Sequence, residues 1–197
     1  MRPEPDAMVS GVTYSVVDAL DSVKLLLMMA EYTFDAVYMF AAISDSKENL
    51  VNIGHAINTN IMTLTNTLEA MSVLKVPRII FSSTVWVYSV SKLVYVYEDV
   101  PLPINESDHI YTTCKLTCES IIKNFCSVRD VDYTILRYGI AYGPGCHPDT
   151  ILSKFITNAI EGKTLTVTGD GTIYRNFLYV TDHAKGNVAA LGDKAKN

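Results

Sequence analysis

The sequence predicts an α/β fold built on a doubly wound parallel sheet. Short runs of apolar and β-branched residues alternate with longer segments that have helical periodicity. One run, from Ala36 to Ala42, is apolar at every position instead of alternating with polar residues. Strands of that kind are buried on both faces, which is typical of parallel sheets covered by helices. Because parallel strands need long crossovers, the repeated order of strand and helix favours helices on both faces.

The expected elements follow one another without a linker rich in Pro, Gly or Ser. Strands are predicted where apolar β-branched runs occur, at residues 12–17, 35–42, 78–83, 132–137 and, briefly, 165–167. Helices are predicted at residues 21–31, 53–74, 109–128, 150–161 and 182–191. In the second of these helices, the Asn and Thr side chains are expected on the outer face. The run at residues 176–180 completes a looser region that follows Gly145.

Composition excludes several classes of protein. The 197 residues are 49% hydrophobic and 19% charged, which excludes intrinsic disorder and supports a sizeable core. The net charge is −5 and no two Lys or Arg are adjacent, so we expect no nucleic-acid-binding face. No apolar run approaches the roughly 18 residues of a membrane span, and no basic-then-apolar leader opens the chain. We therefore expect no membrane association.

The cysteines and histidines favour packing and solvated roles over metal binding. Cys114, Cys118 and Cys126 cluster on one predicted helix, where they are expected to pack and not to form disulfides. This usage predicts a reduced, cytoplasmic setting. The four His lack the regular spacing with Cys or acidic partners that a metal site requires, so no metal site is predicted.

Tyr111 and Lys115 are the first candidates for chemistry. They lie four residues apart on a predicted helix, so they share one face. A phenol with a pKa of about 10 is a poor base at neutral pH. A cation about 4 Å away could supply the roughly 4 kcal/mol needed to lower that pKa toward 7. The pair could then remove a hydroxyl proton while hydride leaves the same carbon.

The spacing of Tyr111 and Lys115 is weak evidence for a catalytic pair by itself, because Tyr88 and Lys92 are also four residues apart. Tyr88 lies in a stretch rich in Val and Tyr, which is a poor helix former, so its lysine need not share a face with it. Tyr111 opens a helical segment and follows a strand that ends in Phe-Ser-Ser-Thr84. The alternative for Tyr111 and Lys115 is a solvated helix face, and the two readings are balanced at this point.

Ordered motifs along the chain favour the chemical reading. They are Val-Val-Asp18-Ala-Leu-Asp, Phe40-Ala-Ala, Asn60-Ile-Met-Thr-Leu-Thr-Asn, Phe-Ser-Ser-Thr84-Val-Trp-Val-Tyr, Leu-Arg-Tyr138-Gly and Gly-Asp-Gly-Thr-Ile-Tyr-Arg175. Together with the Tyr111 and Lys115 pair, they resemble the NAD-dependent epimerase/dehydratase family of extended short-chain dehydrogenases/reductases. The resemblance runs from about residue 12 to residue 191. It implies a Rossmann-like sheet and NAD-dependent epimerisation, or a related oxidation-led conversion, of a nucleotide sugar.

The resemblance also implies roles for single residues. Tyr111 would be the base, Lys115 its pKa-lowering partner and ribose contact, and Thr84 the hydroxyl that orients the substrate oxygen. Arg175 would bind the diphosphate of the substrate, and both Thr84 and Arg175 would be substrate-binding residues. The residues implied around the NAD cofactor are Asp18, Ala19, Phe40, Ala41, Ala42, Ile43, Ser44, Asn60, Ser82, Tyr111, Lys115 and Tyr138. A nucleotide sugar is the implied partner, and the family makes a homodimer an option.

Several positions depart from the family pattern. No glycine-rich turn for the cofactor pyrophosphate occurs, and the first 53 residues contain a single glycine, Gly11. Ile140 stands where sugar epimerases often carry Asn, and Asn176 replaces the aspartate that follows the arginine. We therefore expect residues 1–148 to form a partial NAD-binding domain that lacks its first β-α units. Residues 149–197 would begin a substrate-binding cap.

These departures leave two alternatives to the epimerase reading. The chain could be a truncated or degenerate member that does not catalyse a reaction, since it has no cradle for the pyrophosphate. It could also be a reductase or dehydrogenase of a non-sugar alcohol that uses NAD or NADP, as Ile140 allows. The predicted consequence of the missing turn is weak binding of NAD by this chain alone.

Overall fold

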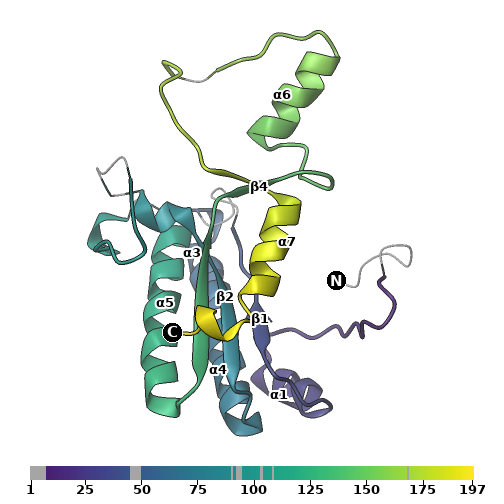
Figure 1. The fold of residues 1–197 in the computed structure, drawn as a ribbon, viewed down its shortest axis with the longest axis vertical. Helices are drawn as coiled ribbons and strands as arrows, with labels where there is room; N and C mark the ends of the chain where they lie inside the picture. The colour runs from purple at the N-terminus through teal and green to yellow at the C-terminus, as the bar shows by residue number, and fades with distance from the viewer. Residues whose placement is uncertain are drawn as a thin grey trace.

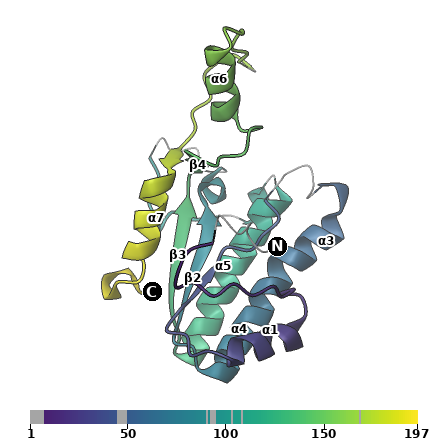
Figure 2. The ribbon, with the colours of Figure 1, turned by 90° about the vertical axis from the view of Figure 1, so that its right-hand side faces the viewer.

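The structure is a three-layer α/β/α arrangement with one helical segment that stands apart from it (Figures 1 and 2). The computed structural model describes residues 8–44, 50–89, 91, 95–102, 104–107, 109–167 and 169–197. Lys92, which repeats the Tyr-Lys spacing with Tyr88, lies outside the described residues.

A parallel three-stranded sheet forms the centre of the molecule. The strands β1 (Val37–Met39), β2 (Arg78–Thr84) and β3 (Asp132–Tyr138) lie in the order β1-β2-β3. Met39 pairs with Phe81, and Thr84 pairs with Tyr138, so β2 and β3 end side by side. A second, two-stranded parallel sheet joins β4 (Ile140–Tyr142) to β5 (Phe177–Tyr179). The parallel α/β fold predicted from the buried apolar runs is confirmed.

Helices cover the two faces of the central sheet unequally (Figure 2). One face packs against α1 (Ser22–Ala30), α4 (Thr63–Leu74) and α5 (Ile110–Arg129), whose side chains form one core with β2. The helix α3 (Ile53–Ile57) runs through the π-helical segment η2 (Asn58–Met62) into α4. The opposite face carries α7 (Val180–Ala189), and α6 (Ile151–Ile160) extends away from the sheet.

The core lies between β2 and the α1, α4 and α5 layer. Phe81 and Ile79 of β2 point into it, and each is at most 2% exposed. Its other fully buried members come from α4 and α5 and are Leu64, Leu68, Met71, Cys118 and Ile122. Burial of this many apolar side chains is what fixes α5, and therefore Tyr111 and Lys115, relative to the end of β2.

Two predicted strands are absent from the described structure. Residues 12–17 lie outside any helix or strand, and residues 165–167 form no strand either. Both runs are largely exposed, and a strand is stable only when its backbone groups find a partner strand. Conversely, the short β4 was not predicted, since it follows β3 after a single residue.

The prediction that Asn and Thr face outward in the long helix was wrong at several positions. Asn60, Thr63, Asn66 and Thr67 are each at most 7% exposed. The threonine hydroxyls donate to carbonyls one turn earlier in their own helix, as in the 2.6 Å bond from Thr63 to the carbonyl of Thr59. The Asn66 amide donates to the carbonyl of Ala19 at 2.9 Å. Because their hydrogen bonds are made locally or to backbone, these polar side chains can be buried.

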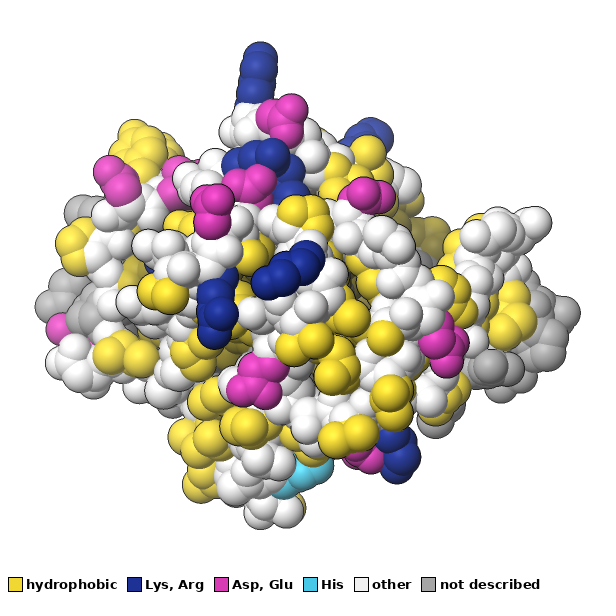
Figure 3. All heavy atoms as spheres, turned by 90° about the horizontal axis from the view of Figure 1, so that it is seen from below, with side chains coloured by type: hydrophobic (Ala, Val, Ile, Leu, Met, Phe, Trp, Pro, Cys, Tyr) yellow, Lys and Arg dark blue, Asp and Glu magenta, His cyan; other side chains and the backbone are white. Residues whose placement is uncertain are grey.

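The face at the bottom of Figure 1, where α4 and α5 end, carries no patch of only positive or only negative side chains. Figure 3 shows Lys and Arg beside Asp and Glu on this face, with apolar side chains between them. Within the described part of the chain, none of the helices is long and apolar enough to cross a membrane.

Candidate functional site

The carboxyl ends of β2 and β3 and the start of α5 enclose a cavity of about 780 Å³. Thr84 comes from the end of β2, Tyr138 from the end of β3, and Tyr111 from the first turn of α5. Ser82 and Ser44, two other residues predicted near the cofactor, also line this cavity. The topology therefore brings together five residues from four separate segments of the sequence. Ligands of open α/β sheets bind at this end of the strands.

Lys115 lies beneath this cavity and not on its lining. It is 3% exposed, and its Nζ donates to the carbonyl of Ser82 at 2.5 Å. The ammonium lies 4.6 Å from the ring centroid of Phe81 and 5.6 Å from that of Tyr111. Burial lowers the pKa of Lys115 to about 8, against the opposing influence of Cys118, Cys114 and Glu119. Lys115 is thus a buried cation that is held close to the phenol ring.

Tyr111 does not have the lowered pKa that its spacing from Lys115 predicted. Burial raises the pKa of its phenol above the ordinary value of 10.0. The Lys115 ammonium contacts the carbonyl of Ser82 and the face of the Tyr111 ring. Burial of the phenol is the cause of this shift, so the direction in this structure is opposite to the expected one.

Thr84 is buried at the point where β2 turns into the short helix η3 (Val85–Tyr88). Its Oγ1 accepts a hydrogen bond from the backbone N–H of Trp86 at 3.3 Å. Accepting this bond caps η3 and orients the hydroxyl, whose own proton can be donated to a substrate oxygen.

A buried ion pair, which sequence reasoning missed, holds the ends of β2, β3 and α5 together. Arg137 donates to both carboxylate oxygens of Glu119, at 3.1 and 2.7 Å. The Ser83 hydroxyl donates to the same carboxylate at 2.5 Å, and Arg137 also donates to the Tyr88 hydroxyl at 2.6 Å. Glu119 lies one helical turn after Lys115, and this spacing is the signal that could have suggested it. Bidentate pairing fixes the relative positions of the strands and the helix.

The Asn60 side chain forms hydrogen bonds with the backbone of the segment that is predicted to contact the cofactor. Its amide accepts from the N–H of Ile43 at 2.7 Å and donates to the carbonyl of Ile43 at 3.2 Å. The segment that contains Phe40, Ala41, Ala42 and Ser44 is thereby tied to the long helix. Asn60 therefore positions this segment.

Asp18 and Ala19 lie before α1 and are not among the residues that line the cavity. The Asp18 carboxylate accepts from the N–H of Leu20 at 2.9 Å, which closes a local turn. The carbonyl of Ala19 accepts from Asn66. The structure therefore gives these two residues local structural contacts.

Tyr138 is held by α7, a contact that the sequence did not predict. Its hydroxyl donates to the Asn187 side chain at 2.5 Å, and its ring centroid lies 3.9 Å from that of His183. Burial raises the pKa of Tyr138 to about 12, although the bond to Asn187 acts in the opposite direction. Tyr38 also donates to the backbone of Asn187, at 2.6 Å. No sequence signal would have singled out His183 or Asn187.

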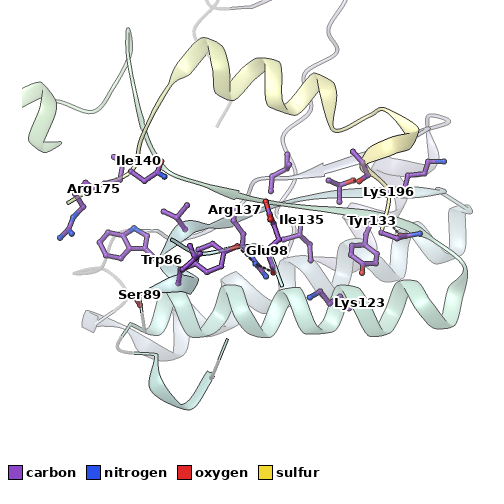
Figure 4. Close-up of a pocket in the computed structure, with 18 of the residues that line it drawn as sticks. Trp86, Ser89, Glu98, Lys123, Tyr133, Ile135, Arg137, Ile140, Arg175 and Lys196 are labelled. Atoms are coloured by element: carbon purple, nitrogen blue, oxygen red, sulfur yellow. Dashed lines mark hydrogen bonds between the residues drawn. The ribbon is translucent and has the colours of Figure 1, made fainter. Parts of the chain in front are cut away.

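Arg175 lies on a second cavity, which is separate from the one that Thr84 and Tyr111 line. This cavity of about 1210 Å³ runs along β3 between α5 and α7 (Figure 4). Arg175 is exposed at one end of it, with its guanidinium 5.2 Å from the ring centroid of Trp86. Trp86 and Ile140 line both cavities. The predicted diphosphate contact is therefore next to the predicted catalytic pair, with Trp86 between them.

The residues present fit one half of an NAD molecule. The cavity at the end of β2 is lined by a hydroxyl and a phenol and has the buried Lys115 ammonium beneath it, and these groups suit a nicotinamide ribose. The pyrophosphate half finds no cradle among the described residues before Ser44. The glycine in that region, Gly11, has open space around it, and the Asp21 carboxylate caps α1 by accepting from the N–H of Lys24 at 3.1 Å. An acidic side chain at a helix N-terminus disfavours a phosphate there.

The three cysteines of α5 are buried and free. Burial raises the pKa of Cys118 to about 12 and that of Cys126 to about 11. Both thiols are therefore neutral and serve as packing residues. Among the residues that the structure describes, no group of three or more His, Cys, Asp or Glu is placed to hold a metal ion.

Comparisons with known proteins identify the family of this chain. Residues 4–197 match the NAD dependent epimerase/dehydratase family. A UDP-glucuronate 4-epimerase of Thermodesulfobacterium geofontis is 28% identical over 175 residues, which cover 89% of this chain and 53% of that protein. An uncharacterized UDP-glucose epimerase of Bacillus subtilis is 32% identical and covers 80% of this chain and 49% of its own length.

Solved structures show the same fold. The UDP-glucuronic acid 4-epimerase of Bacillus cereus, solved with UDP-glucuronic acid and NAD, is 34% identical with a TM-score of 0.74. The match covers 90% of this chain and 55% of that one. The UDP-glucose 4-epimerase of Thermus thermophilus, solved with NAD, is 23% identical and has a TM-score of 0.83 over 95% and 63% of the two chains. The chain spans about half the length of the curated relatives it matches. It belongs to the NAD-dependent epimerase/dehydratase family, whose Rossmann fold it shares.

Proposed function

We propose that this chain carries the catalytic centre of an NAD-dependent enzyme that epimerises a nucleotide sugar, or converts one by a related oxidation. The observation that carries the proposal is the convergence of Thr84, Tyr111 and buried Lys115 at one end of the sheet. NAD bound at this cavity would accept hydride from the sugar carbon. The relatives named above act on UDP-sugars, which makes a UDP-sugar the first substrate to test.

The chain's own residues have separate roles in this proposal. Thr84 donates its hydroxyl proton to the substrate oxygen and orients it toward Tyr111. Tyr111 removes the hydroxyl proton of the sugar, and Lys115 supplies the positive charge next to the phenol. Because burial raises the pKa of Tyr111, proton removal becomes easier at alkaline pH or when further positive charge enters the cavity. We therefore expect the rate to rise with pH up to about pH 8, above which Lys115 loses the positive charge that favours the phenolate.

The lack of a pyrophosphate cradle among the described residues favours a second candidate, a chain that binds the sugar nucleotide but does not turn it over. Backbone contacts to a phosphate are charge-assisted, and each is worth about 1.5–3 kcal/mol. Without these contacts, we expect the dissociation constant of this chain for NAD to lie far above the micromolar range. Fluorescence of Trp86 during titration with NAD measures this affinity, and saturation at micromolar NAD would contradict the expectation.

The substrate class is tested by comparing substrates at high NAD concentration. The full chain is incubated with UDP-glucose, UDP-glucuronic acid and a simple secondary alcohol, and the formation of NADH and of the epimeric sugar is measured. We expect turnover of a UDP-sugar only. The Tyr97→Phe variant, which alters an exposed tyrosine outside the cavity, is the matched control for Tyr111→Phe. Turnover of the simple alcohol alone would assign the chain to the non-sugar dehydrogenases.

A further inference from the structure

Trp86 occupies the boundary between the two cavities. Its side chain lines the cavity of Thr84 and Tyr111 and also the groove along β3. The Arg175 guanidinium lies 5.2 Å from the centre of the indole ring, and Figure 4 shows the two side chains at the same end of the groove. A molecule that reaches from Tyr111 to Arg175 must therefore pass the indole.

The position of the indole is fixed by its neighbours. The backbone N–H of Trp86 donates to Thr84, and the ring meets the His109 ring edge-on with centroids 6.0 Å apart. On the C-terminal side, Val87 is buried and the Tyr88 hydroxyl accepts from Arg137. The indole is therefore a preorganised surface, whereas the exposed Arg175 above it is free to exchange one partner for another.

The chemistry of this pair matches one class of ligand. An indole face binds apolar ring surfaces and cations, and a guanidinium binds phosphate through its fixed donors. A nucleotide sugar has both complementary features, since the C–H face of its sugar is apolar and its diphosphate is anionic.

We propose that Trp86 is a specificity-determining residue that holds the sugar ring of a nucleotide sugar, next to the diphosphate contact that the family resemblance implies for Arg175. When the ligand binds, Arg175 leaves the indole for the diphosphate, and the sugar ring packs on the indole face that Arg175 vacates. This inference rests on the proposed function, because it assumes a nucleotide sugar at this end of the sheet.

The fluorescence of the unliganded chain tests the proposal without any substitution. Trp86 is the single tryptophan, so its emission reports on this site alone. Titration with UDP-glucose is expected to change the emission intensity or maximum with saturation. UDP is expected to produce a smaller change through Arg175, and glucose alone is expected to produce none. An unchanged emission while calorimetry shows that UDP-glucose binds would overturn the proposal.

Variants then separate the two side chains, with affinity measured by calorimetry. We expect Arg175→Gln to weaken UDP-glucose binding about tenfold or more, because a charge-assisted contact is lost. Lys194→Gln is the matched control, since Lys194 lines the same groove at its other end. Trp86→Phe should keep most of the affinity and Trp86→Leu should lose more of it. Equal losses for Arg175→Gln and Lys194→Gln, or equal affinities for the two Trp86 variants, would contradict the site.

Failure of this inference can be told apart from failure of the proposed function. Saturable binding of UDP-glucose with the expected emission change, but without hydride transfer, supports the Trp86 site and defeats catalysis. Hydride transfer with unchanged Trp86 emission supports catalysis and defeats the Trp86 site. Absence of UDP-glucose binding to the wild-type chain defeats both.

Discussion

The end of the sheet that carries the candidate site and the segment that contains α6 are built in opposite ways. Thr84, Lys115 and Glu119 are at most 6% exposed, and they are held by contacts among β2, β3 and α5. Helix α6 has no buried residue, and its ion pairs, such as Lys154 with Asp149, are exposed. Figure 1 shows this segment standing apart from the layered body. The residues expected to perform proton transfer are thus held by packing, whereas the segment around α6 depends on few contacts.

The largest expected difference between the two regions concerns ion pairs. Arg137→Met leaves the Glu119 carboxylate buried without its partner, which costs about 3–5 kcal/mol of unfolding free energy. Lys154→Met removes an exposed pair and should cost less than about 1 kcal/mol. Urea unfolding of both variants measures the contrast. Similar losses would mean that the buried network does not hold the end of the sheet.

Apolar truncations should show the same contrast at a smaller scale. Leu68 is 2% exposed, so Leu68→Ala should cost about 2–5 kcal/mol through lost burial and the cavity that remains. Ile160 in α6 is 81% exposed, and Ile160→Ala should change stability by no more than about 0.5 kcal/mol. Thermal unfolding is the measurement. A large loss for Ile160→Ala would show that α6 packs against the body in solution.

The smallest expected effect is a dependence of stability on pH that comes from Lys115. Its pKa is about 8 in the folded chain and 10.5 in the ordinary reference state. Above about pH 8 the unfolded state binds the additional proton, so the unfolding free energy rises with pH in this window. Relative to Lys115→Met, the wild type should gain about 1 kcal/mol between about pH 7.5 and 9.

The matched control for this effect is Lys123→Met, which alters an exposed lysine on the same helix. It should track the wild type across the same pH range. The comparison stops near pH 9, because burial raises the pKa of Cys118 to about 12. At higher pH the thiol ionises more readily in the unfolded chain, which lowers the unfolding free energy. A wild-type curve parallel to that of Lys115→Met would show that Lys115 is not desolvated.

Local patterns predicted the elements whose signals are also local. Helix α5 was placed within one residue of its observed bounds, and Asp21 caps α1 as a residue before a helix can. The run at residues 12–17 has the composition of a strand, but whether it forms one depends on a partner elsewhere. The same limit applies to Asn60 and Asn66, whose burial depends on backbone groups of distant segments.

The candidate site was predictable as a set of residue types but not as an electrostatic environment. The spacing of Tyr111 and Lys115 placed both side chains at one end of the sheet, next to Thr84. It could not show that burial would raise the pKa of Tyr111 and that the Lys115 ammonium would bond to the carbonyl of Ser82. Nor could it show that Arg175 would lie over Trp86, because cation–π contacts join residues from distant segments.

The most direct test of the account is hydride transfer by the full chain at saturating NAD and UDP-sugar, compared between the wild type and Tyr111→Phe. We expect the substitution to slow NADH formation by about 10²–10⁴-fold, with an unchanged midpoint of thermal unfolding. Equal rates for the two proteins, or no hydride transfer by a wild type that binds both ligands, would contradict the assignment of the catalytic centre.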